Sequence, residues 1–401
     1  MSARAPGANR PRPVTVTVHE LTTFDGARVE GVLRALPGAT TAVVLTHPRR
    51  STTHHPLVDV LLDSGVSVWT QGTRSGGNDV ALVYEKALLD VAAGMSFVRD
   101  LGFSSVVTLG HSGGSALQAF YVEQAAMEPE FRLDVTPAGR PVALAGVRMP
   151  VPDGVIFVAP HPGEGHVLLH CIDPSVVDED PASRNPALDL YRAANGFAAP
   201  PQPSTYSADF LAHYRAAQHD RVHRIDVRAR ELAATASRAR AAFARSETRG
   251  ELRLDSTPRL ITTYRTDADP RGVDPSLDPS GRPYGSAWGP RPDLTNYGFA
   301  GFARVATPDA WLSVWSAFTT NADFRRCAAG VHVPTLFVEA GDDVVGFPAV
   351  SREMFDALRA ADKTHLRVPS LDLGPSPAAG LEEHSIAGHL RRWLSSRYET
   401  V

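Results

Sequence analysis

Short apolar runs alternate with longer amphipathic segments along much of the chain, and this alternation predicts a sheet flanked by helices. Polar and apolar residues alternate over 14–18 and 27–33, and Asp25-Gly26 between them indicates an antiparallel hairpin. Further strands, mostly apolar, are predicted at residues 42–45, 66–70, 105–109, 155–159, 334–339 and 364–368. Apolar residues recur at helical spacing in residues 56–62, 88–98, 116–121, 351–358 and 386–394. We therefore predict an α/β fold with a doubly wound, mostly parallel sheet.

The alternation stops between residues 163 and 329. Residues 208–245 indicate one long helix, whereas residues 267–292 are rich in Pro, Gly and Asp and indicate loops. When the alternation resumes, Ser351 is the predicted N-cap of a helix. We predict a core at residues 14–165 and 330–401, an inserted, mainly helical cap at 166–329, and a disordered leader at 1–13.

Composition narrows the classes of function. Of the 401 residues, 43% are hydrophobic and 21% charged, as is typical of globular proteins, and the formal net charge of −4 argues against nucleic-acid binding. The chain has no run of 18 apolar residues and no apolar segment near its start, so we expect neither a membrane span nor a signal peptide. Cys171 and Cys327 are too few for a disulfide framework. We expect a cytoplasmic protein with a small-molecule substrate.

The most informative motif is Gly110-His111-Ser112-Gly113-Gly114, which has the form G-x-S-x-G. It follows the predicted strand at 105–109 and precedes the helical spacing of 116–121. In this setting the serine lies on a strained strand-to-helix turn with its hydroxyl exposed. The glycines leave room for neighbouring backbone. The motif therefore predicts a nucleophilic serine.

A serine nucleophile needs a base, and the base needs an acid that orients it. Asp342 and Asp343 follow the predicted strand at 334–339, and His384 immediately precedes the final helix. Serine, acid and histidine thus occur in this order, each at the end of a predicted strand or in the loop that follows it. His365 lies inside the predicted last strand and His389 inside the final helix, so neither is in a loop.

With these residues the chain resembles the α/β-hydrolase superfamily, in the serine esterase-like branch that carries a large cap after strand six. The resemblance covers about residues 14–165 and 330–398. It implies that Ser112 is the nucleophile, His384 the base and Asp343 the acid, with Asp342 as the alternative acid.

The resemblance also implies an oxyanion hole made of two backbone amides. One is the amide of Gly113, which follows the nucleophile. The other lies in the loop after the third strand, which here reads His47-Pro48-Arg49-Arg50 in place of the usual His-Gly. Because proline has no N–H, we assign the second donor to Arg49. His47, and His161 at the end of the sixth strand, are candidate substrate contacts.

The resulting prediction is a serine hydrolase that cleaves a carboxylic ester of a small to medium, fairly hydrophobic substrate through an acyl-enzyme. The same triad serves thioesterases, lactonases, amidases and C–C bond hydrolases, and a ligand-binding protein on this fold is the non-enzymatic alternative. His219 and His223, like His166 and His170, are four residues apart as zinc ligands can be, but no third ligand is apparent. We expect no metal ion and no cofactor.

Overall fold

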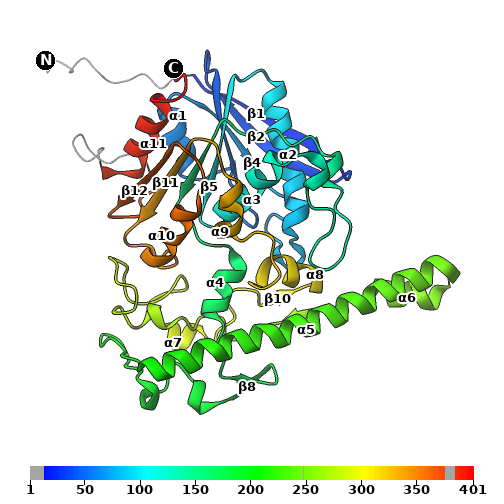
Figure 1. Cartoon of the computed structure of the whole chain (residues 1–401), viewed down its shortest axis with the longest axis vertical. Helices are drawn as coiled ribbons and strands as arrows, with labels where there is room; N and C mark the ends of the chain where they lie inside the picture. The colour runs from blue at the N-terminus through cyan, green and yellow to red at the C-terminus, as the bar shows by residue number, and fades with distance from the viewer. Residues whose placement is uncertain (1–12, 247, 375–383) are drawn as a thin grey trace, which may run out of the picture.

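An eight-stranded sheet forms the centre of the protein (Figure 1). The computed structural model describes residues 13–246, 248–374 and 384–401; the predicted leader falls almost entirely outside them. In spatial order the strands are β1 (Thr15–Thr22), β2 (Arg28–Ala35), β4 (Ser67–Gln71), β3 (Thr41–Thr46), β5 (Ser105–His111), β6 (Gly154–Val158), β11 (Thr335–Ala340) and β12 (Lys363–Val368).

Most neighbouring strands run parallel. The exceptions are β2, which pairs antiparallel with both β1 and β4, and β1 itself at the edge of the sheet. From β4 to β12 all pairs are parallel. Because β3, β5, β6 and β11 are buried on both faces, their sequences are nearly continuous apolar runs, as predicted.

Helices cover both faces of the sheet. The apolar faces of α1 (Leu57–Asp63) and α11 (Ile386–Ser395) join one buried cluster with the strands. The helices α2 (Tyr84–Asp100), α3 (Gly113–Ala126) and α10 (Pro348–Ala357) join the cluster on the other face. This strand order with helices on both faces confirms the predicted doubly wound α/β-hydrolase fold.

The chain between β6 and β11, residues 159–334, adds no strand to the central sheet in any part that the structure describes; we call it the insertion. The predicted long helix is confirmed as α5 (Ala208–Ser246), which runs across the far side of the insertion from the sheet (Figure 1). The insertion also contains α4 (Glu164–Cys171), α6 (Arg249–Ser256), α7 (Pro292–Thr295), α8 (Pro308–Ala310), a π-helical turn (Trp311–Trp315), α9 (Phe324–Cys327) and short 3-10 turns. Its short strands are β7 (Val176–Val177), β8 (Asp180–Arg184), β9 (Ile261–Thr262) and β10 (Val305–Ala306). The predicted limits of the cap, 166–329, stay a prediction.

The N-cap prediction for Ser351 is wrong. Helix α10 begins at Pro348, and the Ser351 amide already donates to the carbonyl of Phe347 inside the helix. The Asp278 carboxylate accepts a hydrogen bond from the Ala349 amide at 3.2 Å. The insertion thus caps α10 from a distant part of the chain, and local sequence does not reveal such a cap.

Within the described ranges, no helix combines the length and the apolar character needed to cross a lipid bilayer.

Candidate active site

The G-x-S-x-G motif forms a tight turn between β5 and α3, which we call the elbow. Ser112 has φ 52° and ψ −122°, a strained conformation for a residue with a side chain. A Cβ on Gly110 would lie 2.6 Å from the carbonyl oxygen of Gly114, and one on Gly114 would lie 2.8 Å from that of Thr46. Both positions therefore require glycine, as predicted.

Ser112 opens into a cavity of about 470 Å³, which we call the nucleophile pocket. Its walls come from the loop after β3, from the ends of β5 and β6, and from the insertion. They include the imidazoles of His47, His54, His55, His111 and His161. The Ser112 side chain makes no capping hydrogen bond to α3. The hydroxyl is therefore available to a molecule in the pocket.

The two aspartates after β11 have different surroundings. Asp342 Oδ1 accepts a hydrogen bond from the Leu371 amide at 2.7 Å and so holds the loop that follows β12. Asp343 Oδ1 accepts one from the Val345 amide at 2.8 Å. Burial raises the pKa of Asp343, while its hydrogen bonds to backbone amides and the nearby His161 oppose that rise.

The structure does not bring His384 together with its predicted partners. His384 is exposed at the start of the last described segment, just before α11. Within the described ranges, no hydrogen bond joins it to Asp343 or Ser112. The residues just before it, 375–383, lie outside those ranges. The competing histidines are where the sequence placed them, since His365 bonds Glu339 from β12 and His389 contacts Arg392 within α11.

His161 lies beside the turn that carries Ser112. Its Nε2 atom is 3.1 Å from the position that a Cβ on Gly113 would take. Its Nδ1 atom accepts a hydrogen bond from the Gly163 amide at 3.2 Å, so in the neutral ring the proton is on Nε2. Burial lowers the pKa of His161. The ring therefore presents an N–H donor near the nucleophile.

The loop after β3 differs from the expected arrangement. The Arg49 amide, our predicted oxyanion donor, donates to Nδ1 of His47 at 3.1 Å. The Arg50 amide donates to the same nitrogen at 3.0 Å. Both amides are thus directed at an imidazole ring in this structure.

Sequence reasoning missed a buried polar cluster beside Gly113. The Glu164 carboxylate accepts a hydrogen bond from the Tyr84 hydroxyl and lies 3.4 Å from Nε of Arg49. Arg49 also pairs with Asp79 at 3.1 Å, and its guanidinium lies 5.2 Å from the centre of the Trp315 ring. Burial, and next the charge of Glu164, raise the pKa of Tyr84. No motif marks Glu164 or Tyr84, because their partners are far away in sequence.

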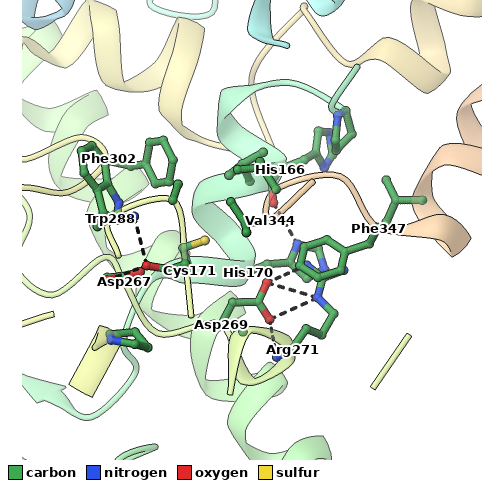
Figure 2. A pocket seen from close by; sticks show the side chains of 18 of the residues that line it. His166, His170, Cys171, Asp267, Asp269, Arg271, Trp288, Phe302, Val344 and Phe347 are labelled. Atoms are coloured by element: carbon green, nitrogen blue, oxygen red, sulfur yellow. Dashed lines mark hydrogen bonds and ion pairs between the residues drawn. The ribbon is translucent and has the colours of Figure 1, made fainter. Parts of the chain in front are cut away.

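A second cavity, of about 210 Å³, adjoins the nucleophile pocket and is lined mainly by the insertion (Figure 2). The two cavities share the side chains of Val167, Ala287, Trp288, Phe302 and Val345. Figure 2 shows Arg271 between Asp269, which it pairs with at 2.6 Å, and the ring of Phe347. The shared wall is apolar, whereas the far wall is charged.

The paired histidines have other partners than a metal ion. His219 and His223 pack against the ring of Phe318. His166 lies 3.1 Å from Asp323, and His170 bonds the backbone of His166. Across the described ranges, no group of three or more His, Cys, Asp or Glu side chains is arranged to hold a metal ion.

Comparisons with known proteins give the fold and little more. No family model and no curated protein sequence matches the chain. Among solved structures, it is similar to DcsB in complex with its substrate analogue, with a TM-score of 0.50, 14% identity, and coverage of 96% of this chain and 100% of that one. The esterase Pf2001 of Pyrococcus furiosus aligns at a TM-score of 0.43 and 10% identity over 99% and 97% of the chains. A putative carboxylesterase of Lactobacillus plantarum aligns at 0.43 and 10% over 96% and 98%. At these identities the likeness concerns the fold, so function has to be argued from the site.

Proposed function

We propose that this protein is a serine hydrolase that cleaves a carboxylic ester through an acyl-enzyme. The observation that carries the proposal is Ser112, held at φ 52° on a glycine-flanked turn and open to a cavity of about 470 Å³. Backbone strain of this kind costs about 1–3 kcal/mol and persists where function requires it. The turn also places the Gly113 amide at the first position of α3, where backbone N–H groups are free to bind an anion.

In the proposed reaction Ser112 Oγ attacks the ester carbonyl carbon while His384 takes the hydroxyl proton. The carbonyl π electrons move onto oxygen, and the Gly113 amide and a second donor, for which the sequence predicts the Arg49 amide, stabilise the resulting charge. Collapse of this intermediate expels the alcohol, which receives the proton from His384, and water then releases the acid in the same two steps. Asp343 orients His384. In this scheme the His384 side chain reaches the pocket.

His161 lies beside the turn that carries Ser112, and its hydrogen bonding argues against a role as the base. A base must offer an unprotonated nitrogen to the serine. The lone pair of His161 is on Nδ1 and is engaged by the Gly163 amide, which leaves a proton on the Nε2 atom near Gly113. We therefore keep His384 as the proposed base, with His161 and His47 as substrate contacts.

The proposed substrate is small to medium in size and fairly hydrophobic. Trp288 and Phe302 form an edge-on aromatic pair with ring centres 5.4 Å apart, and both line the two cavities. A substrate whose carbonyl reaches Ser112 would lie along this apolar wall.

The test is covalent labelling with a fluorophosphonate, followed by mass spectrometry and by p-nitrophenyl ester hydrolysis. We expect one adduct, on Ser112, in the wild type and none in Ser112→Ala. His384→Ala should lower labelling and turnover by a factor of about 10³ or more. A folded wild type that neither labels nor hydrolyses the ester would contradict the proposal and favour a ligand-binding role.

A further inference from the structure

The backbone after β3 offers no free amide where the second oxyanion donor is expected. Pro48 has no N–H. The amides of Arg49 and Arg50 both donate to Nδ1 of His47, at 3.1 and 3.0 Å. An oxyanion that recruited either amide would have to break the hydrogen bond that this amide already makes to Nδ1. The backbone amides of this loop thus bind the His47 imidazole.

These two hydrogen bonds determine where the imidazole carries its proton. A backbone amide only donates, so Nδ1 must hold a lone pair, and the proton of the neutral ring is on Nε2. Burial holds the pKa of His47 well below its usual value, and the charge of Arg49 acts in the same direction. The ring therefore stays neutral, with its tautomer set by the backbone.

The Nε2–H of His47 has no acceptor among the residues that the structure describes, although the residue is only 9% exposed. An N–H donor in a pocket wall that has no protein acceptor is available to a ligand. The ring lines the same pocket as Ser112. Its Cδ2 atom, which is bonded to Nε2, lies 3.7 Å from the position that a Cβ on Gly114 would take. His47 thus flanks the first turn of α3, which begins with the Gly113 amide.

We propose that the imidazole Nε2–H of His47, in place of the Arg49 amide, is the second donor to the oxyanion formed at Ser112. The inference deepens the proposed function and rests on it. During the attack His47 keeps its proton, because it only donates a hydrogen bond, while the Ser112 proton goes to the base. The Arg49 and Arg50 amides act indirectly, since they fix the tautomer and orientation of the ring.

The experiment compares His47→Leu, which removes the donor, with His47→Gln, whose amide N–H reaches a similar position. His332→Leu, at an exposed histidine before β11, is the matched control. Each variant is assayed for kcat and KM on p-nitrophenyl acetate and for the inhibition constant of a trifluoromethyl ketone. That inhibitor adds to serine and forms a tetrahedral oxyanion.

We expect His47→Leu to lose about 10²- to 10³-fold in kcat with little change in KM, as for removal of one oxyanion donor. The affinity for the trifluoromethyl ketone should fall in parallel, and His47→Gln should recover part of both. A merely structural role would not weaken the inhibitor in proportion to kcat.

Several outcomes would overturn the inference. One is a wild-type kcat in His47→Leu, and another is a lowered kcat with unchanged ketone affinity. Complete loss of Ser112 labelling in a folded His47→Leu, equal to that in His384→Ala, would instead make His47 a base. If His47→Leu does not fold, His47→Gln is compared with a folded His47→Asn variant. A kcat and a ketone affinity of His47→Gln that are both no higher than one tenth of the His47→Asn values would also overturn the inference. Failure of the proposed function is read separately, from the labelling and hydrolysis of the wild type alone.

Discussion

The central sheet and the insertion bury their interiors in different ways. The strands of the sheet pack apolar side chains against the apolar faces of helices, in two clusters of which one continues into the insertion. Buried charge lies mainly outside these strands, at Glu85 and Asp90 of α2 and in the insertion. Arg221 on α5 is fully buried and bonds the Glu179 carboxylate and the carbonyls of Asp173 and Tyr264. Asp226, on the same helix, accepts hydrogen bonds from Trp311 and Ser316.

This difference explains why the structures of the two regions are not equally predictable from the sequence. Apolar burial leaves a periodic pattern, because each strand or helix turns one face or both toward the core. Buried charge is stabilised by partners anywhere in the chain, such as Glu179 for Arg221, and so leaves no period. Substitutions in the two regions test this comparison through their effects on stability.

The largest expected effect on stability is that of Arg221→Met in the insertion. Removing the buried guanidinium leaves the carbonyls of Asp173 and Tyr264 without their donor. We expect a loss of about 3 kcal/mol in the free energy of unfolding. Arg228→Met, on the same helix but with 65% of the side chain exposed, should change it by less than about 0.5 kcal/mol. Urea unfolding measures both. Equal changes in the free energy of unfolding for the two variants would mean that the buried charge of Arg221 does not stabilise the insertion.

A smaller effect is expected in the core from Gly110→Ala. The new Cβ would lie 2.6 Å from the carbonyl oxygen of Gly114, and a backbone atom cannot easily move away. We expect a loss of about 1–3 kcal/mol, measured by the same unfolding experiment. Gly250→Ala in α6 of the insertion is the control, since its Cβ would meet only Thr248 Oγ1 at 4.0 Å; it should gain about 0.5 kcal/mol. A neutral Gly110→Ala would refute the close packing of the elbow.

Backbone strain at the nucleophile predicts a gain in stability. Ser112→Gly and Ser112→Ala both remove the hydroxyl, but only glycine relieves the positive φ of 52°. We expect Ser112→Gly to be more stable than Ser112→Ala by about 1 kcal/mol, as seen in thermal unfolding, with no turnover in either. If the alanine variant were the more stable one, the elbow would not be strained.

The smallest expected effect concerns pH. Burial lowers the pKa of His111 to about 3 and that of His55 to about 4, from a usual value of 6.5. Below pH 6.5 the unfolded chain binds these protons and the folded chain does not, so stability is full above pH 6.5 and falls as the pH drops toward 4. In His111→Gln, the melting temperature should fall less between pH 6.5 and 5 than in the wild type. The exposed control His332→Gln should keep the wild-type slope; a His111→Gln slope equal to it would refute burial as the cause.

Most of the fold was predictable from local pattern. The hairpin, the parallel strands, the long helix α5 and the elbow each depend on residues close together in sequence, so their signals are visible without the structure. Where a contact with a residue far away in the sequence determines the local structure, prediction from the sequence was wrong or was not possible. The local pattern predicts Ser351 as an N-cap, whereas the helix end is capped by Asp278, to which no local rule points. The roles of His384 and Asp343 stay predictions.

The sequence by itself determined the strands and helices in their order along the chain, and the place of Ser112 among them. The reason is that the periodicity of apolar residues and the glycine-flanked turn each depend on a few neighbouring residues. Only the tertiary structure decided which groups surround that serine. It turned the amides of Arg49 and Arg50 toward His47, brought Glu164 and Tyr84 beside Gly113, and set Trp288 and Phe302 from the insertion against the pocket. The physical reason is that hydrogen bonds and cavities join segments far apart in the chain, and no periodic pattern records such contacts.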